Sequence, residues 1–154
     1  MSAPTDPPAL THKVVAITTG KFHFLAQFES NAPKTAAWLT AKMPLRHKLI
    51  HVRWSGEAVW MPFGDGAAPD LPFENHTSHP SAGQILVYPG GYSETEILFC
   101  YGGTSFASKM GPLAANHVLT IIQGAEQLAE LGRTVLWEGA QPVHFELLSS
   151  KPRL

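Results

Sequence analysis

The chain has few cysteines, little excess charge and no long apolar stretch. Cys100 is the only cysteine among the 154 residues, which excludes an internal disulfide, and its apolar neighbours predict a buried, structural thiol. Lysine and arginine total 11 against 12 aspartates and glutamates, so the net charge is -1, and the basic residues are scattered. We therefore expect no nucleic-acid partner and no attraction to an anionic membrane surface.

Export and membrane insertion are not indicated either. No stretch approaches the roughly 20 apolar residues that cross a bilayer, and residues 1–12 lack the basic and apolar regions of a secretory signal. We expect a cytoplasmic protein with one domain over residues 13–148, between a flexible N-terminal lead (1–12) and a flexible tail (149–154). No phosphate-loop motif follows the glycine pairs, so no cofactor is expected.

What the chain does contain is a series of short apolar or alternating segments that predict strands. They cover residues 13–18, 22–28, 49–54, 58–62, 84–88, 94–101, 117–122, 133–138 and 143–148. Two helices are expected, one capped by Asn31 and running to about Lys42, and one over residues 124–131 that ends at Gly132. Residues 63–83 are rich in glycine, proline and short polar residues and predict a long surface loop. This pattern indicates a mainly β protein, an antiparallel barrel or sandwich.

Two of the predicted strands are apolar on both faces. They contain the sequences ILVY (85–88) and ILFC (97–100). Such strands need cover on their outer face from a helix, a loop or a neighbouring subunit. We therefore expect a homo-oligomer.

Candidate site residues are concentrated in two segments, LIHVRWSGEAVW (49–60) and YPGGYSETEILFCYG (88–102). The planar guanidinium of Arg53 suits a carboxylate or carbonyl group of a ligand, and it suits equally an ion pair with Glu57 or Glu96. Glu94 and Glu96 would share a face of a strand, where they can accept a proton or be solvated. We take Arg53, Glu94 and Glu96 as candidate catalytic residues. The candidate ligand-binding residues are Trp54, Ser55, Glu57, Trp60, Tyr92, Tyr101, Asn116 and His117.

Two other polar segments are weaker candidates. Glu74, His76 and His79 are of the types that bind zinc or iron, but their spacing matches no closed metal site, so loop hydrogen bonding is favoured over a metal. Asn116 and His117 begin an apolar strand, where a histidine bonded to a carbonyl is favoured over a catalytic one.

Six motifs together resemble a known family: NAPKTAAWL, HVRWSGEAVW, ENHTSHP, YPGGYSETEIL, YGGTSFASKMG and ANHVLTI. Over residues 13–148 the chain resembles an uncharacterised bacterial family of cyclophilin-like proteins, a domain of unknown function, and more distantly the cyclophilin peptidyl-prolyl isomerases. The resemblance implies a closed antiparallel cyclophilin-like β-barrel with two short helices, in which Arg53 is the nearest counterpart of the cyclophilin arginine. Residues 111–116 replace the tryptophan-bearing loop of the isomerases, which argues against prolyl isomerase activity.

Our leading hypothesis is that the protein binds or processes a small polar metabolite, as a hydrolase or isomerase, in a cleft between residues 53–60 and 92–101. Arg53 would hold an anionic or carbonyl group, a glutamate would take a proton or a ligand amine, and Trp54, Trp60 and Tyr92 would form an apolar wall. Two alternatives stay open. One is prolyl isomerisation with Arg53 polarising the peptide bond, and the other is a non-catalytic oligomeric assembly protein.

Overall fold

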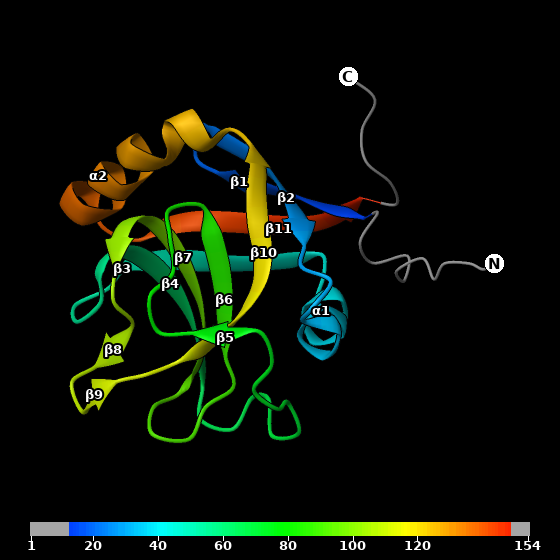
Figure 1. The fold of residues 1–154 in the computed structure, drawn as a ribbon. Coiled ribbons are helices and arrows are strands. Elements are labelled where there is room, and N and C mark those ends of the chain that lie inside the picture. Colours follow the sequence, from blue (N-terminus) through cyan, green and yellow to red (C-terminus); the bar gives the residue numbers. More distant parts are fainter. Residues whose placement is uncertain (1–12, 149–154) are drawn as a thin grey trace.

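Eight antiparallel strands close into a barrel in the structure, a computed structural model that describes residues 13–148 (Figure 1). The strand order is β2-β1-β11-β3-β4-β7-β6-β10, and pairing of β10 with β2 closes the barrel. The prediction of a mainly β, closed antiparallel barrel with two helices is confirmed. The predicted lead (1–12) and tail (149–154) lie outside the described residues. The barrel strands are β1 (Val14–Thr19), β2 (Phe22–Phe28), β3 (Leu45–His51), β4 (Gly56–Gly64), β6 (Gln84–Tyr88), β7 (Thr95–Thr104), β10 (Ala115–Gln123) and β11 (Gln141–Leu148).

Three shorter strands lie outside the closed barrel. β5 (His76–Thr77) adds to the edge of β10 and is the only strand between β4 and β6 in the described chain. β8 (Ala107–Ser108) and β9 (Gly111–Pro112) form a separate two-stranded hairpin. This hairpin contributes to the site described below.

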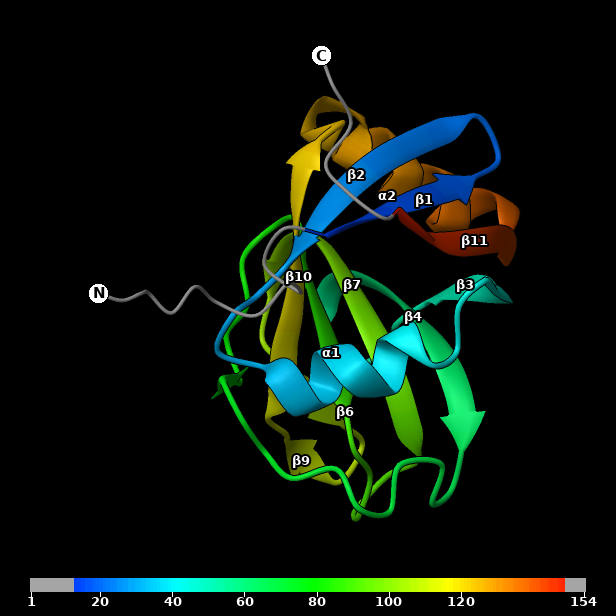
Figure 2. The same cartoon turned by 90° about the vertical axis from the view of Figure 1, so that its right-hand side faces the viewer.

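Helices α1 (Pro33–Thr40) and α2 (Leu128–Glu138) lie on opposite sides of the barrel (Figures 1 and 2). A 3₁₀ turn, Ala125–Gln127, leads into α2. Leu39 of α1 and Leu131 and Val135 of α2 belong to the interior core, because apolar residues spaced three or four apart share one face of a helix. Within residues 13–148, neither helix is long and apolar enough to cross a membrane.

A second apolar cluster lies on the outer face of the barrel. Leu86, Leu98 and Cys100 alternate with interior residues along β6 and β7 and therefore point outwards. Phe106 and Leu113, on either side of the β8–β9 hairpin, bury them. Cys100 is fully buried, as the sequence predicts, and burial raises the pKa of its thiol to about 12. The segment of the same chain that carries the β8–β9 hairpin thus covers part of the outer face of β6 and β7.

The helix predicted over residues 124–131 is present, as a 3₁₀ turn followed by the start of α2, but the prediction for residues 132–138 is wrong. Residues 133–138 are not a strand, because they continue α2, and the helix passes through Gly132 rather than ending there. Gly132 is tolerated inside the helix because the ring of Tyr101 lies against its Cα, where a Cβ would overlap three ring atoms. A glycine selected for close packing has the same sequence signature as a helix stop.

Two other boundaries differ from the prediction. β3 covers residues 45–51 instead of 49–54, so Arg53 and Trp54 lie on a bend after the strand. Asn31 does not cap α1, whose N-cap is Ala32 and carries no side-chain hydrogen bond. Pro33 does occupy the start of the helix, as expected for a residue without a backbone N–H.

The first turn of α1 is capped from the long loop. The Glu74 carboxylate accepts hydrogen bonds from the Thr35 backbone N–H (2.7 Å) and hydroxyl (2.8 Å). A negative charge here satisfies a backbone donor without an intrahelical partner and interacts favourably with the helix dipole. Asn116 holds the loop in place, because its side chain accepts a hydrogen bond from Glu74 N (3.0 Å) and donates to the carbonyl of Pro72 (2.9 Å).

Substituting Glu74 with alanine is expected to lower the free energy of unfolding by ~1–2 kcal/mol, since it removes a helix cap and leaves buried donors unpaired. Glu74→Gln keeps an acceptor oxygen without the charge and should lose about half as much. Urea unfolding followed by circular dichroism measures both. Asp70→Ala, at an exposed position of the same loop, is the control and should change stability by less than ~0.5 kcal/mol. Equal losses at positions 70 and 74 would contradict the capping role.

Candidate functional site

A cleft of about 280 Å³ opens on the outer face of the barrel beside β4 and β7. It brings together five residues that the sequence singles out: Arg53, Trp54, Ser55, Trp60 and Glu96. The remaining lining residues are Ile50, His51, Val52, Ser93, Ala107, Ser108 and Lys109. The volume lies just below the ~300–1,000 Å³ usual for small-molecule pockets.

Ser55 joins the two segments that form the rim of this cleft. Its side chain is buried, and its hydroxyl donates to the carbonyl of Ala107 (3.1 Å) and accepts from the N–H of the same residue (3.0 Å). Its own carbonyl accepts a hydrogen bond from Ser105 N (2.9 Å). These three hydrogen bonds hold the bend that contains Arg53 against the β8–β9 hairpin.

Two tryptophans supply the apolar surface. Trp54 is 56% exposed because the bend after β3 projects it away from the barrel. Trp60, on β4, is half-buried against the outer apolar cluster. Indole rings at a partly open cleft offer flat surfaces on which a planar, apolar group can stack.

Glu96 is the buried acid of the cleft, with only 7% of its surface exposed. Loss of hydration, reinforced by the neighbouring charge of Glu94, raises the pKa of Glu96 from 4.5 to about 8. No hydrogen bond or ion pair engages its carboxyl group within residues 13–148. Glu96 is therefore protonated at neutral pH, and a neutral carboxyl group can donate a hydrogen bond as well as accept one.

Arg53 and Lys109 are the basic residues of the cleft, and both are exposed. Of the two interpretations of Arg53, the ion pair does not form, because neither Glu57 nor Glu96 pairs with it in the described part of the chain. Glu57 instead accepts a hydrogen bond from Gly103 N (2.8 Å). With Glu96 neutral, the cleft carries positive charge without a counter-charge from its own lining.

Two of the candidate residues lie next to the cleft without lining it. Glu94 precedes β7, and its carboxylate accepts a hydrogen bond from Gly64 N (2.9 Å). The Tyr101 hydroxyl is 2.7 Å from His51 Nε2, and His51 Nδ1 is 2.8 Å from the Val52 carbonyl. If Nδ1 carries the ring proton and donates to that carbonyl, Nε2 accepts from the tyrosine. Tyr101 thus orients a histidine that does line the cleft.

Tyr92 faces a different hollow. It is 85% exposed and lines a largely apolar groove of about 300 Å³ together with Phe73, Tyr88 and Pro112. Gly90 and Gly91, both with positive φ, form the bend that leads to it. The single wall predicted from Trp54, Trp60 and Tyr92 is therefore divided between two surfaces.

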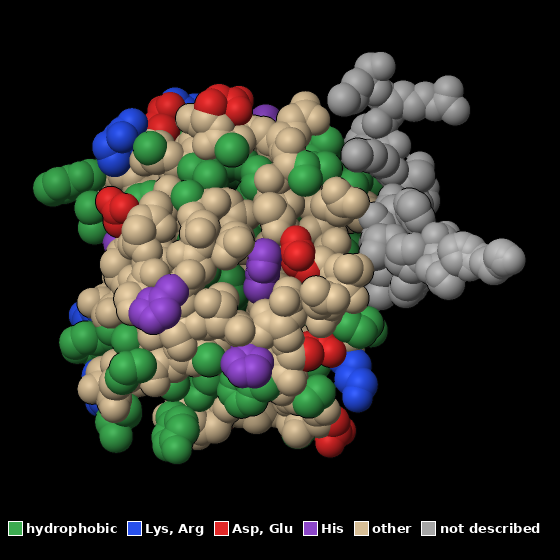
Figure 3. All heavy atoms as spheres, viewed as in Figure 1, with side chains coloured by type: hydrophobic (Ala, Val, Ile, Leu, Met, Phe, Trp, Pro, Cys, Tyr) green, Lys and Arg blue, Asp and Glu red, His purple; other side chains and the backbone are tan. Residues whose placement is uncertain are grey.

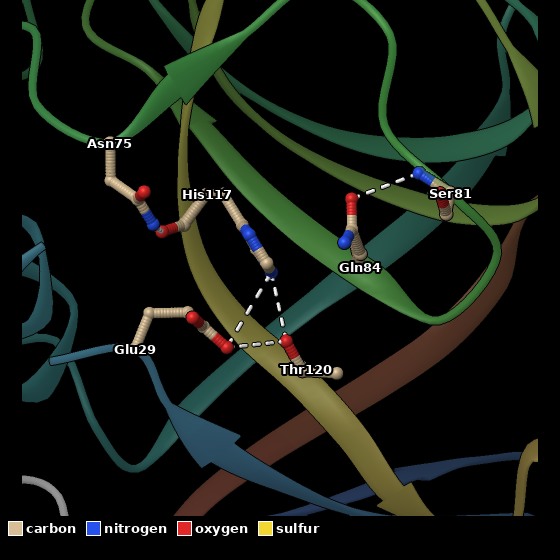
Figure 4. Close-up of polar contacts among 6 residues, drawn as sticks. All are labelled: Glu29, Asn75, Ser81, Gln84, His117 and Thr120. Carbon is tan, nitrogen blue, oxygen red and sulfur yellow. Dashed lines mark hydrogen bonds and ion pairs between the residues drawn. The ribbon is translucent and has the colours of Figure 1, made fainter. Parts of the chain in front are cut away.

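Asn116 and His117 lie on β10, away from the cleft, and their side chains contact other parts of the chain. His117 Nε2 is 2.8 Å from the Thr120 hydroxyl, which donates to the Glu29 carboxylate (2.6 Å), as Figure 4 shows. The space-filling view shows a histidine beside an acidic side chain near the centre of that face (Figure 3). Burial lowers the pKa of His117 while the charge of Glu29 opposes this effect. The backbone of Asn75 is linked to β10 through His117 N (3.1 Å).

The weak metal candidates do not converge. Glu74 caps α1, His76 packs beside the ring of Phe73, and His79 Nδ1 is 3.4 Å from the Ser105 hydroxyl. Within the described range, no group of three or more His, Cys, Asp or Glu residues is placed to hold a metal ion.

The prediction misses His51, Ser93 and Lys109 as lining residues. His51 could have been found from its position two residues before Arg53. Lys109 carries no comparable signal, because it reaches the cleft only through the β8–β9 hairpin and the hydrogen bonds of Ser55.

The fold and cleft define a small closed β-barrel with a candidate ligand site on its outer face. The chain belongs to the DUF3830 family, described as a protein of unknown function, whose model matches residues 15–147. The predicted membership of an uncharacterised family with a barrel fold is thus confirmed. None of the curated proteins matches the chain.

Solved structures share the fold at low identity. One is the structure of McbB in complex with tryptophan, with 17% identity and a TM-score of 0.67 over 91% of this chain and 45% of McbB. The chain therefore spans less than half the length of McbB. Another is the solution structure of the hypothetical protein AF2241 from Archaeoglobus fulgidus, with 13% identity and a TM-score of 0.58 over 89% of this chain and 95% of that protein. At these identities the likeness concerns the barrel fold alone.

Proposed function

We propose that the protein binds a small organic acid in the cleft of Arg53, with the ligand's carboxylate on the guanidinium and its apolar body against Trp54 and Trp60. The observation that carries this proposal is the charge of the cleft. A cation without an ion pair in the described chain lines the same hollow as a neutral, buried carboxyl group. An anionic ligand supplies the missing counter-charge, and a guanidinium binds a carboxylate with two parallel hydrogen bonds.

Glu96 has the properties of a proton-transfer group in this proposal. A carboxyl group with a pKa of about 8 holds its proton at neutral pH and exchanges it readily near that pH, which is the condition for general acid–base chemistry. It can also donate a hydrogen bond to a carbonyl or carboxylate of the ligand. The fold neighbour McbB was solved with tryptophan, which shares a carboxylate and a planar apolar ring with the proposed ligand class but also carries an ammonium group.

The test is isothermal titration with two matched pairs: phenylacetate against phenylacetamide, and indole-3-acetate against indole-3-acetamide. The acids should bind and the neutral amides should not, because only the acids provide the counter-charge. Arg53→Ala should weaken binding of the acids roughly 10- to 100-fold, the usual cost of losing a charged hydrogen bond.

Arg46→Ala is the matched control, since Arg46 is an exposed arginine on β3 outside the cleft. It should leave the affinity unchanged, and circular dichroism should show both variants folded. Equal binding of acids and amides, or an Arg53→Ala variant that binds as tightly as the wild type, would overturn the proposal.

A further inference from the structure

Lys109 is the second cation of the cleft, and its position is fixed by the chain. It lies at the turn of the β8–β9 hairpin, where Ala107 pairs with Pro112 and Ser108 with Gly111. The Ser108 hydroxyl accepts a hydrogen bond from Met110 N (3.0 Å) and braces this turn. Ser55 holds the base of the hairpin through both backbone groups of Ala107.

The two cations come from different segments that are tied together. Arg53 is two residues before Ser55, and Lys109 is two residues after the residue that Ser55 binds. Both residues line one hollow of about 280 Å³. Neither makes an ion pair within residues 13–148, where Lys21 pairs with Glu130 and the contact of His117 with Glu29 (3.8 Å) is ionic only when the imidazole is protonated.

The charge in this hollow exceeds what one carboxylate neutralises. Two cations line it, and its acid, Glu96, is buried and uncharged at neutral pH. The carboxylates of Glu57 and Glu94 lie outside this lining, accept hydrogen bonds from the backbone N–H groups of Gly103 and Gly64, and form no ion pair with either cation within the described residues. A ligand with a single negative charge leaves one cation without a partner.

We propose that Lys109 is a second anchoring residue and that the ligand is a dicarboxylic acid, with one carboxylate on Arg53 and the other on Lys109. This inference rests on the proposed function, because it assumes that Arg53 binds the first carboxylate. Two cations on separate segments match two separated acid groups better than one compact dianion. The apolar part of the ligand lies between them, against the tryptophans.

The experiment compares phenylacetate, which has one carboxylate, with phenylsuccinate, which has two on a similar skeleton. Titration calorimetry on the wild type should give roughly tenfold tighter binding of phenylsuccinate, as expected for an added charge-assisted contact. Lys109→Met keeps most of the side-chain length and removes the charge. It should abolish the preference for phenylsuccinate, so that binding of phenylsuccinate weakens about tenfold while binding of phenylacetate weakens by much less. Lys48→Met, at an exposed position of β3 outside the cleft, is the control and should change neither.

The outcomes separate this inference from the proposed function. If phenylacetate binds in an Arg53-dependent way but phenylsuccinate binds no tighter, or if Lys109→Met weakens both equally, the second anchor is wrong and the proposed function stands. If phenyl phosphate binds more tightly than phenylsuccinate and loses that advantage in Lys109→Met, the site takes one compact dianion and the dicarboxylate assignment is overturned. If Arg53→Ala changes none of these affinities, the proposed function fails and this inference fails with it.

Discussion

Replacing Glu96 with glutamine is expected to stabilise the protein by several kcal/mol at pH 8–9 and to change its stability little at pH 5. The carboxyl group is buried in the folded chain, and its pKa is about 8 instead of 4.5. Above pH 4.5 the unfolded chain releases this proton while the folded chain keeps it. Unfolding is therefore favoured increasingly as the pH rises, and stability that is complete below pH 4.5 is lost up to about pH 8.

The magnitude follows from the same linkage. One proton contributes at most ~1.4 kcal/mol per pH unit, so the loss between pH 4.5 and about 8 has an upper limit of roughly 5 kcal/mol. Glutamine has nearly the same shape and no charge at any of these pH values, so Glu96→Gln should remove this contribution. The difference between the two proteins should grow with pH and level off above about pH 8.

Urea unfolding at pH 5, 6, 7, 8 and 9, followed by tryptophan fluorescence, measures the effect. Glu146→Gln serves as the matched control, because Glu146 is an exposed glutamate on β11, and it should keep the wild-type dependence on pH. Parallel pH profiles for the wild type and Glu96→Gln would show that Glu96 is ionised in the folded protein at neutral pH. That result would also remove the charge argument for an anionic ligand.

Gly132→Ala is expected to destabilise the protein by about 2–3 kcal/mol, although alanine is the better helix former by ~1 kcal/mol. Gly132 is buried within α2, and the ring of Tyr101 occupies the place of its missing side chain. A methyl group there forces the ring or the helix to move. The ring in turn is held by its hydroxyl contact with His51 (2.7 Å), so the change should extend to the cleft.

A second background makes this prediction sharper. In Tyr101→Ala the ring is gone, and Gly132→Ala should then stabilise the protein by up to ~1 kcal/mol through helix propensity alone. Thermal and urea unfolding of the four proteins in the double-mutant cycle give the coupling directly. If Gly132→Ala lowers the stability equally with and without the Tyr101 ring, the ring is not the reason for a glycine at position 132.

The sequence predicts the strands well wherever apolar alternation is strong. Residues 22–28 and 84–88 are strands with the predicted bounds, because both combine aromatic or β-branched residues with clear turn signals. The errors occur where a tertiary contact overrides a local signal. From the sequence alone Gly132 indicates a helix end, but in the structure it makes room for the ring of Tyr101. Asn31 likewise indicates a helix cap, but Glu74, about forty residues further along the chain, caps α1 instead.

The same distinction between local signals and tertiary contacts applies to the candidate site. Arg53, Trp54, Ser55 and Trp60 are found together because one short segment carries them, and Glu96 joins them because β7 pairs with β4. Asn116 and His117 lie elsewhere, since β6 separates β10 from β7 in the sheet. Lys109 could not be predicted, because its position depends on a hairpin fixed by a buried serine. The roles of all these residues in ligand binding stay predictions until the titrations are made.

The outer apolar cluster has a consequence for how such proteins diverge. The segment with the β8–β9 hairpin is anchored by Phe106 and Leu113 on the outside of the barrel, apart from the interior core. Substitutions at the hairpin turn can therefore accumulate without disturbing the interior packing on which folding depends. If the proposed function holds, exchanging this one short segment would change the ligand preference while the barrel stays the same.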